Sequence, residues 1–359
     1  MQFQTLSGSS TMLLLLLLAP VSICQASSWD LSKFSTLVAF GDSYSDDARL
    51  DYFREHQGQA PPPGWVNPVN YHSADGGRPW PEYVRQYAGV RLYNYAVSGG
   101  VCSNAITPRY YDAIRGPYPS VSQYEIPAFQ ADSKVVNKDG SKFLIAPVDQ
   151  TVYNVWVGAN DIGTGGLLTD SQVLGTSIAD CVDCVFAQVQ KLYNLGARYF
   201  TLLNVVPLNL APLYAMPDAG GVGPNGYWPD KPANRTAVSI SMFELVVSNN
   251  QIYKYRLPFE VLVQKNFPGA RFALFDVNSL FRDFYNNPSR YFNGTAPANV
   301  TGFIHHCDIH RGNCVNQPSP DSYMWYDELH LSEQTARSIA SEYLNVIKGK
   351  SKYATYLSG

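Results

Sequence analysis

Charged side chains are scarce in this sequence, and neither sign dominates. Asp, Glu, Lys and Arg make up 15% of the 359 residues, and the formal net charge is −3. No run of Lys or Arg stands out, so we do not expect nucleic acid as a partner. Disorder is excluded too, because a disordered chain carries more charge and fewer hydrophobic residues than the 45% found here.

Regular repeats and linkers are also lacking. Gly and Pro follow no period, which excludes a collagen-like chain, and no internal repeat or low-complexity stretch divides the sequence. No second long apolar run follows the one at the N-terminus. We therefore expect residues 27–359 to form a single globular domain without a stable membrane anchor.

The one pronounced apolar segment lies near the N-terminus. Leu13–Leu18 is an unbroken leucine run that is too short for a transmembrane helix but suits the core of a secretory signal peptide. Cys24 and Ala26 supply small residues before a cleavage point, although residues 1–12 lack the usual Lys or Arg. Residues 1–26 are therefore predicted to be a signal peptide, and the protein is predicted to be secreted and extracellular.

Three N-x-S/T sequons agree with export. They begin at Asn234, Asn293 and Asn299. Each is a weak signal alone, but behind a signal peptide we expect them to carry N-linked glycans and to lie at the surface.

Few cysteines are present, and one of the six leaves with the signal peptide. The other five suffice for two disulfides and one free thiol in an oxidising compartment: Cys102, Cys181, Cys184, Cys307 and Cys314. Cys307 and Cys314 would close a short loop and are the preferred pair. The histidines around Cys307 would suggest zinc in a cytosolic protein, but in a secreted chain we favour the disulfide and expect no metal.

The partners of the second bridge are ambiguous. Cys181 and Cys184 are candidates, but helix neighbours three residues apart have Cβ atoms about 5–6 Å apart, whereas a disulfide needs about 3.8 Å. Either this pair lies at a helix end or distorted turn, or Cys102 takes one of the two. A thioredoxin-like redox role is disfavoured because the CxxC lies inside a helical pattern.

Strand-like and helix-like segments alternate along the chain. Short apolar runs predict a buried strand at 36–40 and further strands at 91–96, 151–157, 198–206 and 271–277. Helical patterns occur at 46–56, 81–87, 171–195, 237–266 and 335–347. This alternation predicts an α/β fold with a parallel sheet covered on both faces. Long loops at 57–80, 103–150, 207–232 and 286–324 are expected to carry function.

Two short motifs contain the residues of a nucleophilic site. Gly41-Asp-Ser43-Tyr directly follows the first predicted strand, at the end where α/β proteins bind ligands. A serine hydroxyl is a poor nucleophile unless a base lies beside it. Asp327-Glu-Leu-His330 can supply one, because an Asp carboxylate orients an imidazole and stabilises its charged form. Alone, each motif is more simply a turn or surface charge.

Acyl transfer also needs hydrogen-bond donors for the developing oxyanion. Asn160 follows the strand predicted at 151–157, and its side-chain amide is one such donor. Gly99 follows the strand predicted at 91–96, and a glycine presents its backbone N–H without a side chain that blocks approach. Taken alone, either residue is equally well explained as part of an ordinary turn at the end of a strand.

Together these blocks resemble the four signature blocks of the GDSL/SGNH family of serine esterases and lipases, in the family order and across essentially the whole mature chain. The resemblance implies a three-layer αβα sandwich with a central parallel sheet. It implies that Ser43 is the nucleophile, His330 the base and Asp327 its orienting partner. The oxyanion hole would consist of Ser43, Gly99 and Asn160, and no cofactor is implied.

Finer features resemble secreted fungal acetylesterases of carbohydrate esterase family 16: Phe40-Gly-Asp-Ser-Tyr44, Asn94-Tyr-Ala-Val-Ser-Gly-Gly100 and Trp325-Tyr-Asp-Glu-Leu-His330. The resemblance implies a small-molecule or oligosaccharide ester as substrate, with an acetyl group on plant cell-wall carbohydrate. Tyr44 replaces the commonest leucine, and Leu-Ser332 replaces Pro-Thr after the histidine. Neither change threatens the triad, because Ser332 can still cap the last helix. A monomer is the default expectation.

Two other functions stay open. An extracellular lipase or phospholipase on longer acyl chains would have a deep apolar pocket or a lid, and no lid is evident. A catalytically silent carbohydrate-binding protein would lack a triad member, and none is missing. Trp65, Trp80, Trp228, Trp325 and tyrosines near them are candidates for stacking on sugar rings, although large aromatic side chains more often anchor a core.

Overall fold

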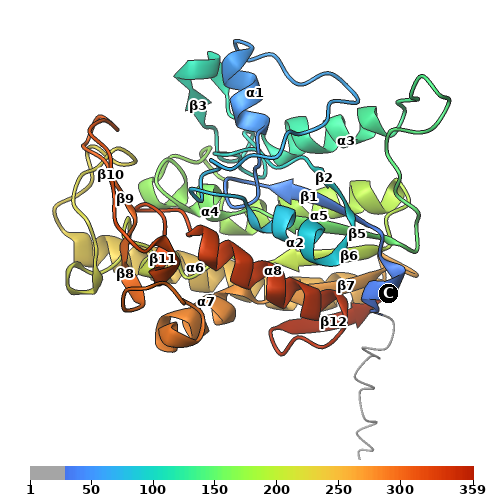
Figure 1. Cartoon of the computed structure of the whole chain (residues 1–359). Helices are drawn as coiled ribbons and strands as arrows, with labels where there is room; N and C mark the ends of the chain where they lie inside the picture. Colours follow the sequence, from blue (N-terminus) through green and yellow to red (C-terminus); the bar gives the residue numbers. More distant parts are fainter. Residues whose placement is uncertain (1–28) are drawn as a thin grey trace, which may run out of the picture.

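The computed structural model describes residues 29–359, and the predicted signal peptide lies outside them. At its centre is a six-stranded sheet in the order β12-β7-β6-β5-β1-β2 (Figure 1). Five strands are parallel: β1 (Thr36–Gly41), β2 (Arg91–Asn94), β5 (Thr151–Trp156), β6 (Tyr199–Leu203) and β7 (Arg271–Phe275). The predicted α/β fold is confirmed, and it has one antiparallel edge strand that the pattern missed, β12 (Ala354–Ser358).

Helices cover both faces of the sheet, because alternate side chains of each strand point to opposite sides. On one face, Leu37 and Val152 share a core with α2 (Trp80–Ala88), α7 (Val277–Asn286), α8 (Glu333–Ile347) and the N-terminal half of α6 (Arg235–Pro258). On the other face, Val38 and Tyr153 share a core with α3 (Ile126–Asp132), α5 (Ile178–Asn194) and the C-terminal half of α6. The result is a three-layer αβα sandwich (Figure 1).

The long connections contain short elements of their own. Among them are the helices α1 (Arg49–Glu55) and α4 (Ala159–Ile162) and several short 3-10 and π helices. There are also two-stranded ladders of β3 (Tyr110–Tyr111) with β4 (Gly116–Pro117), β8 (Asn299–Phe303) with β11 (Tyr323–Trp325), and β9 (His305–His306) with β10 (Val315–Asn316). Among the helices of residues 29–359, none is both long and apolar enough to cross a membrane.

Helix ends follow local capping chemistry. The helix predicted at 171–195 begins only at Ile178, because Ser177 and Asp180 form a capping box there. Ser332 caps α8, as expected, by accepting the N–H of Thr335. The helix α7 was not predicted, although Asp276 caps it by accepting the N–H of Ser279.

The cysteines pair in one expected and one corrected way. Cys307 and Cys314 form the predicted disulfide, but the second disulfide joins Cys102 to Cys184. The candidate pair Cys181 and Cys184 is therefore wrong, and Cys181 is a buried free thiol. Both residues lie within the regular helix α5, whereas Cys102 arrives from another segment with its Cα 6.2 Å from that of Cys184, a favourable separation.

Candidate active site

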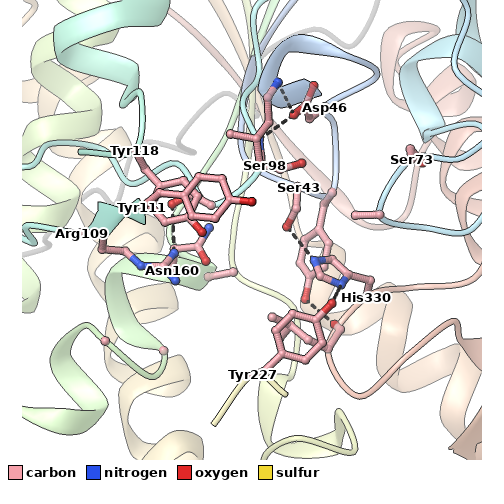
Figure 2. Close-up of a pocket in the computed structure, with 18 of the residues that line it drawn as sticks. Ser43, Asp46, Ser73, Ser98, Arg109, Tyr111, Tyr118, Asn160, Tyr227 and His330 are labelled. Atoms are coloured by element: carbon pink, nitrogen blue, oxygen red, sulfur yellow. Dashed lines mark hydrogen bonds between the residues drawn. The ribbon is translucent and has the colours of Figure 1, made fainter. Parts of the chain in front are cut away.

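The loops at the carboxyl edge of the parallel sheet enclose a cavity of about 740 Å³ (Figure 2). Its walls come from the segments after β1, β2 and β5 and from the segment before α8. All four long loops predicted from the sequence contribute lining residues, among them His72, Tyr118, Tyr227 and Arg311. The parallel sheet therefore brings the ends of distant segments to one edge, which is where α/β proteins bind ligands.

Ser43 lies in the tight turn that follows β1. Gly41 makes this turn possible, because it has φ of +153° and a Cβ there would lie 2.1 Å from the backbone oxygen of Trp156 in β5. The Asp42 carbonyl accepts the N–H of Ser45 at 2.9 Å and closes the turn. Ser43 is 7% exposed, so its hydroxyl lies in the wall of the cavity rather than on the outer surface.

His330 links Ser43 to Asp327. Its Nε2 is 3.0 Å from the Ser43 Oγ, and its Nδ1 is 2.9 Å from Oδ2 of Asp327 (Figure 2). The backbone holds the imidazole in place, because the His330 carbonyl accepts the Tyr326 N–H at 2.8 Å and α8 begins three residues later, at Glu333. The structure thus joins the three residues that the sequence predicted as a triad, across 287 positions of the chain.

Asp327 is buried and accepts four hydrogen bonds. Oδ1 accepts the backbone N–H groups of Leu329 at 2.8 Å and His330 at 2.7 Å. Oδ2 faces His330 Nδ1 and also accepts the Tyr227 hydroxyl at 2.7 Å. Burial alone would raise the pKa of Asp327, but the nearby His330 and these hydrogen bonds outweigh burial and lower the pKa to about 2. The carboxylate is therefore charged at any pH at which His330 can act as a base.

Donors for an oxyanion lie beside Ser43. The Asn160 side chain donates one amide N–H to the Gly100 carbonyl at 2.9 Å, which orients the amide. Gly99 has φ of +79°, and a Cβ there would lie 2.3 Å from the Tyr118 ring. No backbone carbonyl in residues 29–359 accepts the N–H of Ser43 or of Gly99. The three predicted donors therefore line the same cavity as the Ser43 hydroxyl.

Of the aromatic residues expected at the site, tyrosines line the cavity and the four tryptophans do not. Trp80, Trp228 and Trp325 are buried in the core, so the suggestion that they stack on sugar rings is wrong. Trp65 lines a separate cavity of about 150 Å³. Tyrosines line the main cavity instead, since large apolar tryptophans gain more from the core than from a polar cavity: Tyr44, Tyr110, Tyr111, Tyr118, Tyr214 and Tyr227.

Two of these tyrosines form a platform that sequence analysis did not single out. The rings of Tyr111 and Tyr118 stack with centroids 4.7 Å apart and an interplanar angle of 9°. Figure 2 shows them across the cavity from His330. The tyrosines in the loop at 103–150 were the only sign of this platform in the sequence. The two rings stack only because β3 pairs with β4 and brings Tyr111 next to the segment that contains Tyr118.

A serine, an imidazole and a carboxylate joined by hydrogen bonds are the arrangement that serine hydrolases use, and here these groups lie at the carboxyl edge of a parallel sheet. The family model described as GDSL-like Lipase/Acylhydrolase matches residues 37–343. The chain belongs to this family and is a carboxylic ester hydrolase.

Characterised relatives cover most of the chain. An acetylesterase of Hypocrea jecorina is 42% identical over 325 residues, which cover 90% of this chain and 91% of that protein. An acetylesterase of Thermothelomyces thermophilus is 24% identical over 341 residues, or 92% of each chain. Among solved structures, the α/β hydrolase LAE5 from the metagenome of Lake Arreo is 14% identical, covers 88% of this chain and 95% of that one, and has a TM-score of 0.38.

Proposed function

We propose that this enzyme is a secreted serine esterase that removes short acyl groups, above all acetyl, from esters of plant cell-wall carbohydrate. Ser43, His330 and Asp327 form its triad, and Ser43, Gly99 and Asn160 its oxyanion hole. The observation that carries the proposal is the 3.0 Å contact between Ser43 Oγ and His330 Nε2 in the wall of the cavity. The same cavity is lined by Ser43 and Gly99, whose N–H groups no backbone carbonyl of residues 29–359 accepts.

The reaction follows from this geometry. His330 Nε2 takes the Ser43 proton as Oγ attacks the ester carbonyl, and the carbonyl oxygen becomes an oxyanion. The N–H groups of Ser43 and Gly99 and the Asn160 amide stabilise that charge. His330 then donates the proton to the leaving alcohol, which leaves an acyl-enzyme. A water molecule, deprotonated by His330, then attacks the acyl carbon. His330 returns that proton to Ser43 Oγ as the acyl–Oγ bond breaks, which releases the acid and the free serine. These steps transfer only protons and the acyl group, so they require no cofactor.

The lining of the cavity favours a carbohydrate over a long acyl chain. Aliphatic side chains larger than alanine are few among the described lining residues, namely Leu50, Pro108 and Leu329. Polar and charged side chains and tyrosines make up most of the rest. A sugar presents hydroxyls for such groups and an apolar ring face for the stacked Tyr111 and Tyr118. The two acetylesterase relatives support the same choice of acyl group.

Secretion is supported by features of the folded domain. Two disulfides are typical of an oxidising compartment. Asn234 and Asn293 are exposed, whereas Asn299 is half-buried and its Oδ1 accepts the N–H of Gly302 at 2.7 Å. Mass spectrometry of the protein from the medium of a eukaryotic host should find an N-terminus at Ser27 and glycans at Asn234 and Asn293 first. Retention in the cell with an intact N-terminus would contradict export.

The activity is tested by comparing p-nitrophenyl acetate, butyrate and octanoate, with Ser43→Ala as the control. We expect acetate to be hydrolysed fastest and Ser43→Ala to lose activity about 10⁵-fold or more while it stays folded. Release of acetate from acetylated xylo-oligosaccharides is then the next measurement. A preference for octanoate would indicate a lipase or phospholipase. Unchanged activity in Ser43→Ala would refute the triad, and a folded wild type inert on every ester would indicate a silent binding protein.

A further inference from the structure

A tyrosine hydroxyl shares the triad carboxylate with the histidine. The Tyr227 hydroxyl donates to Asp327 Oδ2 at 2.7 Å, and its oxygen lies 3.2 Å from His330 Nδ1. Since Oδ2 is itself 2.9 Å from Nδ1, the three atoms form a compact triangle. Figure 2 shows Tyr227 beside His330, on the side opposite Ser43.

This contact has a consequence for the base. The backbone N–H groups of Leu329 and His330 donate to Oδ1 of Asp327, which also lies 3.1 Å from His330 Nδ1. Tyr227 shares the nearer oxygen, Oδ2, with the imidazole. A hydroxyl that donates to a carboxylate takes part of its negative charge. Asp327 then holds the proton of a charged His330 less tightly than it would alone. The hydroxyl also helps to fix the orientation of the carboxylate, because it donates to Oδ2 whereas the backbone N–H groups donate to Oδ1.

Tyr227 is itself held by a second loop. The Arg311 guanidinium lies 4.3 Å from the centroid of the Tyr227 ring, a cation–π distance, and Arg311 Nε donates to the Gly226 carbonyl at 3.0 Å. A side chain at position 226 would prevent this approach, because a Cβ there would lie 2.6 Å from Arg311 Cγ. The ring of Tyr227 is therefore enclosed between Arg311 and His330, with its centroid 5.5 Å from that of the imidazole.

A disulfide and three hydrogen bonds constrain the loop that carries Arg311. The Cys307–Cys314 disulfide closes it. Inside it, the Asp308 carboxylate accepts the N–H groups of His310 at 2.9 Å and Gly312 at 2.8 Å, and the Asn313 amide at 2.7 Å. These bonds restrict the conformations open to the small loop, and Arg311 projects from it onto Tyr227.

We propose that Tyr227 is a positioning residue of the triad, which acts through Asp327 to set the proton affinity of His330, and that Arg311 holds it there from the disulfide-closed loop. The proposal rests on the proposed function of Ser43, His330 and Asp327. Other charged and titratable groups surround this cluster: Asp42, Tyr44, Asp75, Tyr214, Arg311, Tyr326 and Glu328. All of them stay in place in a Tyr227→Phe variant, so a change in its pH profile reports the loss of the Tyr227 hydroxyl.

The test is the pH profile of kcat/KM on p-nitrophenyl acetate for the wild type and Tyr227→Phe. Without the hydroxyl, Asp327 offers more charge to His330, so the imidazole keeps its proton to a higher pH. We expect the acidic limb of the profile to move up by about half a pH unit or more, with a larger loss of rate at pH 6 than at pH 8. Arg311→Gln should move it in the same direction by a smaller amount.

Tyr343→Phe is the matched control, because it also removes a buried hydroxyl, which lies 2.7 Å from Thr201 Oγ1 in the core. It should lower thermal stability without moving the acidic limb. Superimposable profiles for wild type and Tyr227→Phe would overturn the positioning role of Tyr227, and an unmoved Arg311→Gln profile would overturn the role of Arg311. Both results are distinct from failure of the proposed function, which would appear as wild-type activity that survives in Ser43→Ala.

Discussion

At the scale of single residues, the candidate oxyanion hole depends on how Asn160 is anchored. One amide N–H is engaged by the Gly100 carbonyl, and the same amide carries a second N–H. The anchor comes from the loop that contains Gly99, so one loop both presents a backbone donor and orients a side-chain donor. Such an arrangement stabilises charge effectively, because the donors need not reorganise when the charge appears.

Replacing Asn160 by Ala should therefore lower kcat on p-nitrophenyl acetate by about 10²–10³-fold with little change in KM, because the donor acts on the transition state. Steady-state kinetics at saturating ester measure the change, and the melting temperature controls for a folding defect. A loss of less than about tenfold in a folded variant would remove Asn160 from the oxyanion hole.

At the scale of elements, helix α5 is tied to the loop after β2 through Cys184. Its other cysteine, Cys181, faces the Thr107 hydroxyl at 4.0 Å and remains unbridged. Burial raises the pKa of the Cys181 thiol to about 12, so the reactive thiolate is nearly absent at neutral pH. The disulfide also lies close to the site, because Cys102 N–H donates to the carboxylate of Asp161, the neighbour of Asn160.

We predict that peptide mapping without reduction finds Cys102 linked to Cys184, and that iodoacetamide labels Cys181 only after unfolding. The double variant Cys102→Ser/Cys184→Ser should lose about 2–4 kcal/mol of stability, because the bridge closes a long loop. Cys181→Ser is the matched control and should cost far less. A peptide that links Cys181 to Cys184 would contradict the connectivity.

At the scale of the whole molecule, buried carboxylates make stability depend on pH. Burial raises the pKa of Asp42, Asp47 and Asp161 from 3.8 to about 7. Between pH 4 and 7 the folded state therefore holds protons that the unfolded chain has lost, and this contribution to stability disappears as the pH rises through 7. Asp327 has the opposite shift, to about 2, and its contribution is constant over this range.

Thermal unfolding should therefore occur at a lower temperature at pH 8 than at pH 5, by about 2–4 °C or more. Asp47→Asn offers a check, because the amide imitates the protonated acid and the Asp47 side chain lies beside Asn67. We expect the melting temperatures of this variant at pH 5 and pH 8 to differ less than those of the wild type. A wild type that melts at the same temperature at both would show that these carboxylates are not protonated in the fold.

Much of the fold and the core of the candidate site can be predicted from sequence because the relevant signals are local. Five strands appear as short apolar runs, and the alternation of strands with helices predicts a parallel sheet. Ser43, Gly99 and Asn160 each follow a strand, and parallel strands end at the same edge. That rule brings these residues together without knowledge of how the loops pack. The strand β12 escaped detection because its five residues do not form a continuous apolar run, and only pairing with β7 makes it a strand.

The sequence by itself therefore predicted the parallel α/β sheet from the alternation of strands and helices, and the Cys307–Cys314 pair from the short loop between the two cysteines. It predicted Ser43, His330 and Asp327 as a set only through the resemblance of their motifs to a known family, because no local pattern links residues 287 positions apart. Only the tertiary structure decided the contacts between loops far apart in the chain. Cys102 meets Cys184 across 82 residues, and Tyr227 meets Asp327 across 100. Such contacts leave no local periodicity, because they depend on how loops of irregular conformation pack against one another at the edge of the sheet.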